Sequence, residues 1–181
     1  MRSLPLVSSD HQAHVSFGRI APYLRSALVI ASGGGFALAC VLTLVPLFGI
    51  PLGSWWEALI QTHGHLQIFG WAGLFVVGVG LHFFPRLRGA LLVRPGLLPW
   101  ILGVYVAGLG LRFISQPLLA VSGALLWKVL LVFSGILEVI ALPAIFLFGS
   151  FLPGSDLLFS LSGPTGLALI LCLAVNLWPA L

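Results

Sequence analysis

Long apolar stretches constrain the fold of this chain more than any other feature of its sequence. A helix that crosses a bilayer needs about 20 mostly apolar residues, and five segments of the chain qualify, the third being shorter than the others. They lie at about 26–48, 56–84 and 96–113, within 117–151, and at about 157–178. Only 7% of the 181 residues are charged, whereas soluble domains carry about 25%. The predicted fold is therefore all-α, a polytopic bundle of about five transmembrane helices with lipid as its solvent.

The basic residues predict how this bundle is oriented. Six of the eight lysines and arginines fall before the first segment or between the second and third: Arg2, Arg19, Arg25, Arg86, Arg88 and Arg94. Loops rich in such residues stay in the cytoplasm, so we expect a cytoplasmic N-terminus and a location in the cell (inner) membrane. Residues 1–23 would form a cytoplasmic tail, and residues 24–181 would form the transmembrane domain. Because the chain ends directly after the fifth segment, we expect it to be part of a longer protein.

Composition and motifs exclude several classes of function. A net charge of +4, from eight basic and four acidic residues, is too small for nucleic-acid binding, which needs clustered basic side chains. The sequence shows no nucleophile–base–acid arrangement, no phosphate-binding loop and no pair of carboxylates on one helix, so hydrolysis and phosphoryl transfer have no support. Cys40 and Cys172 lie within apolar segments and are expected to be small, buried hydrophobic residues.

Two histidines near the start of the second segment are the first candidates for a cofactor site. His63 and His65 are two positions apart, so on a regular helix their side chains differ by about 200° in direction. We expect them to face different neighbours, as ligands of two centres or as one ligand and one hydrogen-bonding group. Haem iron, copper and zinc all accept imidazole ligands. The alternative is that both histidines are simply hydrated at the outer membrane surface.

Other ionisable residues also fall within or beside the apolar segments, where a charged group costs about 2.5 to 3.5 kcal/mol on insertion scales. Glu138 lies in the middle of the fourth segment and is expected to be a protonated carboxyl, a proton-relay group or the partner of a cation on another helix. Lys128 lies ten residues earlier, about 15 Å along the helix, so it should mark the outer end of that helix and not pair with Glu138. His82 is expected near the inner surface, and Glu57 near the interface.

The second segment carries a pattern of histidines, glycines and a proline that matches a known family without a gap. The matching residues are His63, His65, Phe69, Gly70, Trp71 (where the family has Phe), Gly78, Pro85 and Gly89. In this register the stretch resembles the NnrS family, multi-pass membrane proteins linked to nitric oxide metabolism and described as containing haem and copper. The chain departs from the family at Leu66, which replaces an acidic residue, at Gln67, which replaces methionine, and at residues 86–88, which replace Asn-Trp-Thr.

The same stretch also resembles the second helix of subunit I of haem–copper oxidases. His63 precedes Phe69 by six residues, as a low-spin haem ligand precedes a phenylalanine in that superfamily. The segment around Asn176 is similar to an Ala-x-Asn-Leu segment of the NnrS family. These resemblances imply a b-type haem bound through His63, with His65 as a second ligand or a hydrogen-bonding group, and copper as a further metal. The sixth iron ligand would come from residues outside this chain or from another subunit, and the role would be redox or related to nitric oxide.

A membrane protein without a cofactor is the alternative from a different class. The chain would then be a transporter or scaffold subunit, with Glu138 and Lys128 lining a path through the membrane. An absorbance spectrum separates the two hypotheses, because a haem protein has a Soret band and a cofactor-free transporter has none. The sequence leaves open whether the protein is an enzyme.

Overall fold

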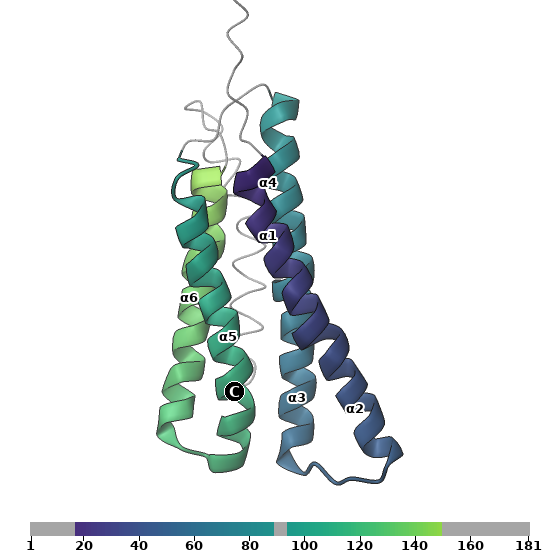
Figure 1. Cartoon of the computed structure of the whole chain (residues 1–181). Helices are drawn as coiled ribbons and strands as arrows, with labels where there is room; N and C mark the ends of the chain where they lie inside the picture. Colours follow the sequence, from purple (N-terminus) through teal and green to yellow (C-terminus); the bar gives the residue numbers. More distant parts are fainter. Residues whose placement is uncertain (1–16, 89–93, 150–181) are drawn as a thin grey trace, which may run out of the picture.

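The described part of the chain is almost entirely helical (Figure 1). The computed structural model describes residues 17–88 and 94–149. The elements in chain order are α1 (Phe17–Ile30), η1 (Ala31–Ala37), α2 (Leu38–Leu47), α3 (Ser54–His65), η2 (Leu66–Gly73), α4 (Leu74–Arg88), α5 (Leu98–Ser122) and α6 (Leu125–Gly149). The first three run on as one long helix, and so do the next three. Within the described residues, four helices are therefore long and apolar enough to cross a membrane; the fifth expected segment, at about 157–178, lies outside this range.

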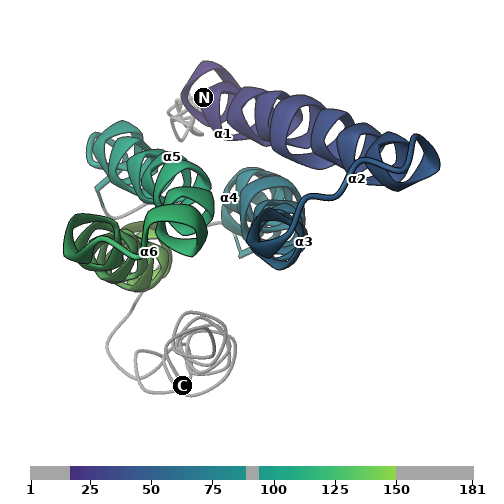
Figure 2. The same cartoon turned by 90° about the horizontal axis from the view of Figure 1, so that it is seen from below.

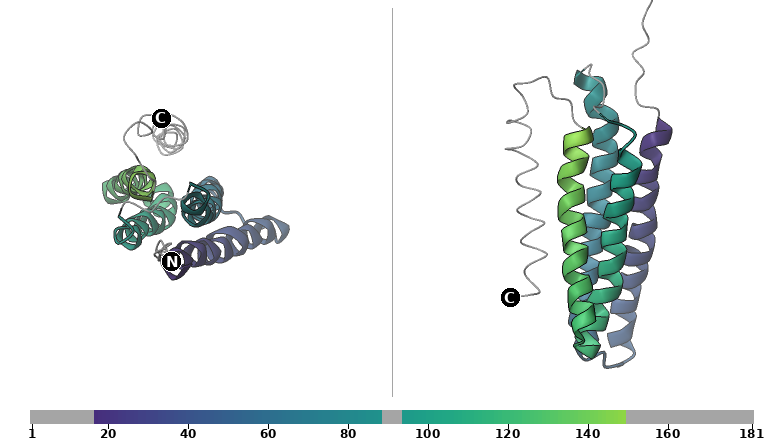
Figure 3. Two further views of the ribbon diagram at one scale, coloured as in Figure 1. Left: turned by 90° about the horizontal axis from the view of Figure 1, so that it is seen from above. Right: turned by 90° about the vertical axis from the view of Figure 1, so that its left-hand side faces the viewer.

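The long helices form an elongated antiparallel bundle with two distinct ends (Figures 1 and 3). The turns at residues 48–53 and 123–124 share one end, called the turn end below. The start of α1, the end of α4 and the start of α5 share the opposite end, called the arginine end, with Arg19, Arg86 and Arg94. Viewed along the bundle, the α3–α4 helix lies beside α1 and α5, and α6 packs on α5 (Figure 2).

Helix boundaries differ from those expected at two places. α5 continues to Ser122, beyond the expected end near residue 113, and it includes Pro117 as a buried residue. α5 ends at Gly123, whose φ of 62° lies in the left-handed region that terminates helices and favours glycine. This glycine, and not the proline, therefore separates the third helix from the fourth. α1 begins at Phe17, within the segment assigned to the tail.

The outer surface of the bundle is apolar, unlike the surface of a soluble protein. Large apolar residues face outward on every long helix, including Val29, Val76, Ile114 and Ile140, which are 51% to 71% exposed. The interior combines apolar residues with a set of buried polar ones: Thr62, His65, Arg112, Ser115, Gln116, Ser134 and Glu138. A continuous apolar surface of this kind would drive aggregation in water, whereas lipid solvates it. The arrangement is the one that a multi-pass membrane protein requires.

Two π-helical segments, η1 and η2, pack against each other where the first two long helices meet. Glycines allow this approach: a Cβ atom at Gly34 would overlap Cδ1 of Leu66, and one at Gly70 would lie 2.5 Å from Cγ2 of Ile30. Gly34 therefore allows η1 and η2 to come close, and Gly70 allows η2 to pack against the end of α1. π-helical turns recur at functional sites, and η2 begins directly after His65.

Candidate functional site

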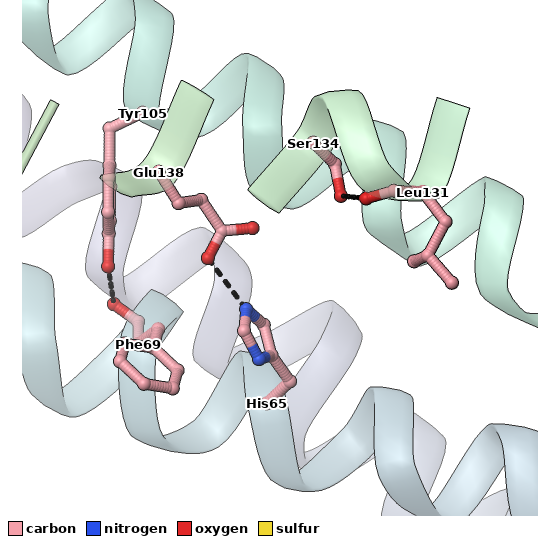
Figure 4. Close-up of polar contacts among 6 residues, drawn as sticks. All are labelled: His65, Phe69, Tyr105, Leu131, Ser134 and Glu138. Atoms are coloured by element: carbon pink, nitrogen blue, oxygen red, sulfur yellow. Dashed lines mark hydrogen bonds and ion pairs between the residues drawn. The ribbon is translucent and has the colours of Figure 1, made fainter. Parts of the chain in front are cut away.

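A histidine and a carboxyl group meet in the interior of the bundle (Figure 4). The Nε2 atom of His65 on α3 lies 2.7 Å from Oε2 of Glu138 on α6. Their side chains are 1% and 0% exposed, although the residues are 73 positions apart in the chain. A contact this short between two buried ionisable groups is a strong hydrogen bond. One of the roles predicted for Glu138 is to pair with a group on another helix, and in the structure its partner is His65 on α3.

α5 adds a third ionisable group beside this pair. Arg112 is buried, with 3% of its surface exposed, and it lies close enough to His65 to interact with it electrostatically. A guanidinium keeps its positive charge at every physiological pH, so its burial inside the bundle is costly unless neighbouring polar groups offset it. The site is therefore an ionisable cluster of His65, Arg112 and Glu138, built from three helices.

A glycine on α5 allows α6 to come close at this cluster. A Cβ atom at Gly108 would lie 3.0 Å from Cγ of Glu138, 3.1 Å from the carbonyl oxygen of Ser134 and 3.2 Å from Cβ of Leu137. Because one of these atoms belongs to the backbone, a methyl group would fit only if α6 shifted. Gly108 lies about one helical turn before Arg112, so it sets how closely the carboxyl-bearing helix approaches α5 at the cluster.

Polar side chains continue from the ionisable cluster toward the turn end. The side-chain amide of Gln116 on α5 donates a hydrogen bond of 2.7 Å to Oε1 of Gln61 on α3. Ser115, next to Gln116, is completely buried. On α3, the buried hydroxyl of Thr62 donates to the carbonyl oxygen of Ala58 at 2.7 Å. The ionisable cluster is therefore one end of a larger polar region between α3, α5 and α6.

His63 faces away from this region. Its Nδ1 atom lies 3.2 Å from the carbonyl oxygen of Gly34 in η1, and the residue is half-buried. Because a carbonyl oxygen can only accept, Nδ1 carries the proton in this contact and Nε2 keeps its lone pair. The two histidines thus contact different neighbours, as their spacing predicts. Among the described residues, no three histidine, cysteine or carboxylate side chains gather at a point where they would hold a metal ion.

The other ionisable residues discussed above lie toward the two ends of the bundle. Lys128 is exposed in the first turn of α6, and Glu57 is exposed in the first turn of α3, so both lie at the turn end. His82 lies toward the arginine end, where its ring packs edge-on against Phe17 with centroids 5.8 Å apart. These positions agree with the predicted locations near the membrane surfaces.

One expectation about the cysteines is wrong. Cys40 has a free thiol and is exposed on the outer surface of α2, although the sequence suggested burial. A thiol is a small and weakly polar group, so it suits a helix surface that faces lipid as well as a packed interior. Cys172 lies outside the described residues.

Arg112 is the member of the ionisable cluster that sequence reasoning missed. The third span was expected to end near residue 113, one position after this arginine, and the arginine was not considered as a site residue. Because α5 extends to Ser122, Arg112 instead lies about 15 Å inside the end of the helix. The position of Arg112 on the buried face of the helix was the sequence signal that would have identified it. Buried residues recur along α5 at intervals of four and three: Leu98, Leu102, Tyr105, Leu109, Arg112 and Gln116.

Comparisons of the chain with protein-family models, with curated proteins and with solved structures find no match. Assignment of a function therefore depends on the geometry of the described residues and on the resemblance of the stretch that begins at His63.

Proposed function

We propose that this chain is a multi-pass membrane protein that binds a b-type haem through Nε2 of His63. The observation that carries the proposal is the 3.2 Å contact between Nδ1 of His63 and the carbonyl oxygen of Gly34. Histidines that bind metals almost always donate their other ring N–H to a carboxylate, a carbonyl or water, which fixes the tautomer and the orientation of the ring. His63 has this arrangement, and the residue is half-buried.

The resemblance to the NnrS family and to haem–copper oxidases supports the same assignment. If the arginine end faces the cytoplasm, as the positive-inside bias predicts, the turn end faces outward. His63 lies nine positions after the start of α3, about 14 Å from that end, which places it in the outer half of the second span. A haem bound there would transfer electrons or bind a small gas such as nitric oxide.

Donors beyond the described residues would complete the site. His65 is bonded to Glu138, so we assign it to the ionisable cluster and not to the iron. A second axial ligand would come from another subunit, a second copy of the chain or residues outside the described ranges. A copper ion would need such donors as well, since no group of three suitable side chains is found in the part of the chain that the structure describes.

An absorbance spectrum of the detergent-purified protein, oxidised and then reduced with dithionite, tests the haem proposal. We expect a Soret band and a b-type reduced spectrum that disappear in His63→Ala. They should persist in His82→Ala, a control on the same long helix, and in His65→Ala. A wild-type protein that remains colourless after expression with a haem precursor would refute the proposal.

The ionisable cluster favours a second candidate, ion-coupled transport, because buried charged groups in membrane proteins commonly line ion pathways. Lys128, which was expected to line a path with Glu138, lies at the turn end; Arg112 and His65 occupy the interior instead. A colourless protein that carries ions across proteoliposome membranes, with transport lost in Glu138→Gln, would support this candidate. Absence of transport in such proteoliposomes would exclude it for the ions tested.

A further inference from the structure

The buried residues of α5 change in character half-way along the helix. Toward the arginine end they are Leu98, Leu102, Tyr105 and Leu109. Toward the turn end they include Arg112, Ser115 and Gln116. The change falls between Leu109 and Arg112, within a single helical turn.

The other two helices that form the ionisable cluster divide at the same level. In the second long helix, the buried polar residues Thr62 and His65 precede a series of large buried apolar residues: Phe69, Leu74, Val77 and Leu81. On α6, Ser134 and Glu138 precede the buried apolar residues: Ala141, Leu142 and Ile145. Both helices start at the turn end, whereas α5 finishes there, so the order along the sequence reverses while the position in space is the same (Figure 1). The bundle interior therefore has a polar half toward the turn end and an apolar half toward the arginine end.

The polar half extends from near the turn end to the middle of the bundle. Gln61 lies about 10 Å from the start of α3, Gln116 lies about 9 Å from the end of α5, and Glu138 lies about 20 Å from the start of α6. Gln61 is exposed whereas its hydrogen-bond partner Gln116 is buried. The two glutamines thus stand where the polar interior meets the surface.

Several polar atoms in this half have no hydrogen-bond partner among the described residues, although their residues are at least 96% buried. They are Oγ of Ser115, Oε1 of Gln116, Nδ1 of His65 and Oε1 of Glu138. In the apolar half, by contrast, the buried hydroxyl of Tyr23 donates to a carbonyl at 2.7 Å, and that of Tyr105 does so at 3.1 Å. Two further atoms without a partner among the described residues, Oε1 of Gln67 and Nδ1 of His82, lie beyond His65 toward the arginine end, but they belong to half-buried residues. Buried polar atoms in proteins nearly always bond to protein or to water, and one buried water satisfies about three of them.

We propose that the polar half of the interior is a water-filled passage that opens at the turn end between α3 and α5 and ends at the His65–Glu138 pair. Phe69, Leu74 and Leu109 close it toward the arginine end. Water in the passage supplies hydrogen-bond partners to the four buried atoms that have none among the described residues. The inference goes beyond haem binding and does not require it, because His63 is not part of the passage.

Cysteine accessibility tests this passage in the full chain, with Cys40 and Cys172 replaced by serine. Ser115→Cys is a nearly isosteric change inside the passage, and Ile114→Cys is its control one position away, on a side chain that is 51% exposed on the outer surface. A charged methanethiosulfonate reagent attacks the thiolate, which forms in water and is suppressed in apolar surroundings. We expect Ser115→Cys, measured by mass spectrometry in proteoliposomes, to react at least about tenfold faster than Ile114→Cys.

Two further variants locate the closed end and guard against a local effect at Ser115. Leu102→Cys, buried in the apolar half, should react as slowly as Ile114→Cys. Ser134→Cys on α6 should react faster than the outward-facing Ile136→Cys, which repeats the comparison on a second helix. Slow reaction of both serine-derived cysteines would overturn the proposal by showing a dry interior. Equally fast reaction of Leu102→Cys would overturn it by showing that the apolar half is not closed.

Discussion

Replacing Glu138 by alanine should lower the free energy of unfolding of the bundle by about 3 kcal/mol, within the range for truncating a buried side chain that also holds a hydrogen bond. The structure explains why the loss should be this large. The carboxyl group is fully buried and lies 2.7 Å from Nε2 of His65, and its removal leaves a cavity where it packs against α5. Hydrogen bonds between membrane helices average only about 0.6 kcal/mol, with a maximum of about 1.7. We therefore expect a coupling energy of about 1.5 kcal/mol for the His65–Glu138 contact itself, and the remainder from the cavity that the truncated side chain leaves.

A double-mutant cycle of Glu138→Ala, His65→Ala and the double variant measures both quantities. Unfolding by sodium dodecyl sulfate in mixed micelles, followed by helix content, gives the free energies. Glu57→Ala is the control, because this carboxyl group is exposed in the first turn of α3, and its stability should match that of the wild type. A coupling energy near zero, or a Glu138→Ala protein as stable as the control, would show that the contact does not hold α3 to α6.

Two other predictions concern the packing around the cluster. Gly108→Ala should destabilise the bundle by about 1 to 3 kcal/mol in the same unfolding assay, as overpacking of a buried position does. Gly110→Ala is the control: a Cβ atom there meets nothing within 4 Å, so this variant should be as stable as the wild type or slightly more stable. Equal effects of the two substitutions would contradict the close approach of α5 and α6. Tyr23→Phe removes a buried hydrogen bond of 2.7 Å to the carbonyl oxygen of Leu98. It should lower the free energy of unfolding by about 1 kcal/mol. An unchanged stability would show that this hydrogen bond does not hold α1 to α5.

The separate roles proposed for His63 and His65 follow from their contacts. His63 donates a hydrogen bond from Nδ1 to the carbonyl oxygen of Gly34, which leaves the lone pair of Nε2 available. His65 is hydrogen-bonded to Glu138 in the interior. The helical period that places them about 200° apart would allow a single short segment to bind the proposed haem on one side and to contribute to the polar interior on the other. The variants His63→Ala and Ser115→Cys probe these two sides independently.

The sequence by itself determined the features that depend on one segment at a time. Hydropathy over about 20 residues predicts the four long helices that the structure describes, and the helical period predicts that His63 and His65 face different neighbours. It also identifies Glu138 as a group that needs a partner. The haem, the family resemblance and the orientation in the membrane remain predictions.

Only the tertiary structure decided which groups meet. His65 and Glu138 are 73 positions apart, and Arg112 joined them because α5 ends at Gly123 and not near residue 113. In lipid, apolar faces of many helices pack about equally well, and small residues set where two helices come close. The contact at Gly108 places α6 against α5 at the level of the cluster. Such pairings depend on the combined packing of several helices, and no single segment of the sequence contains that information.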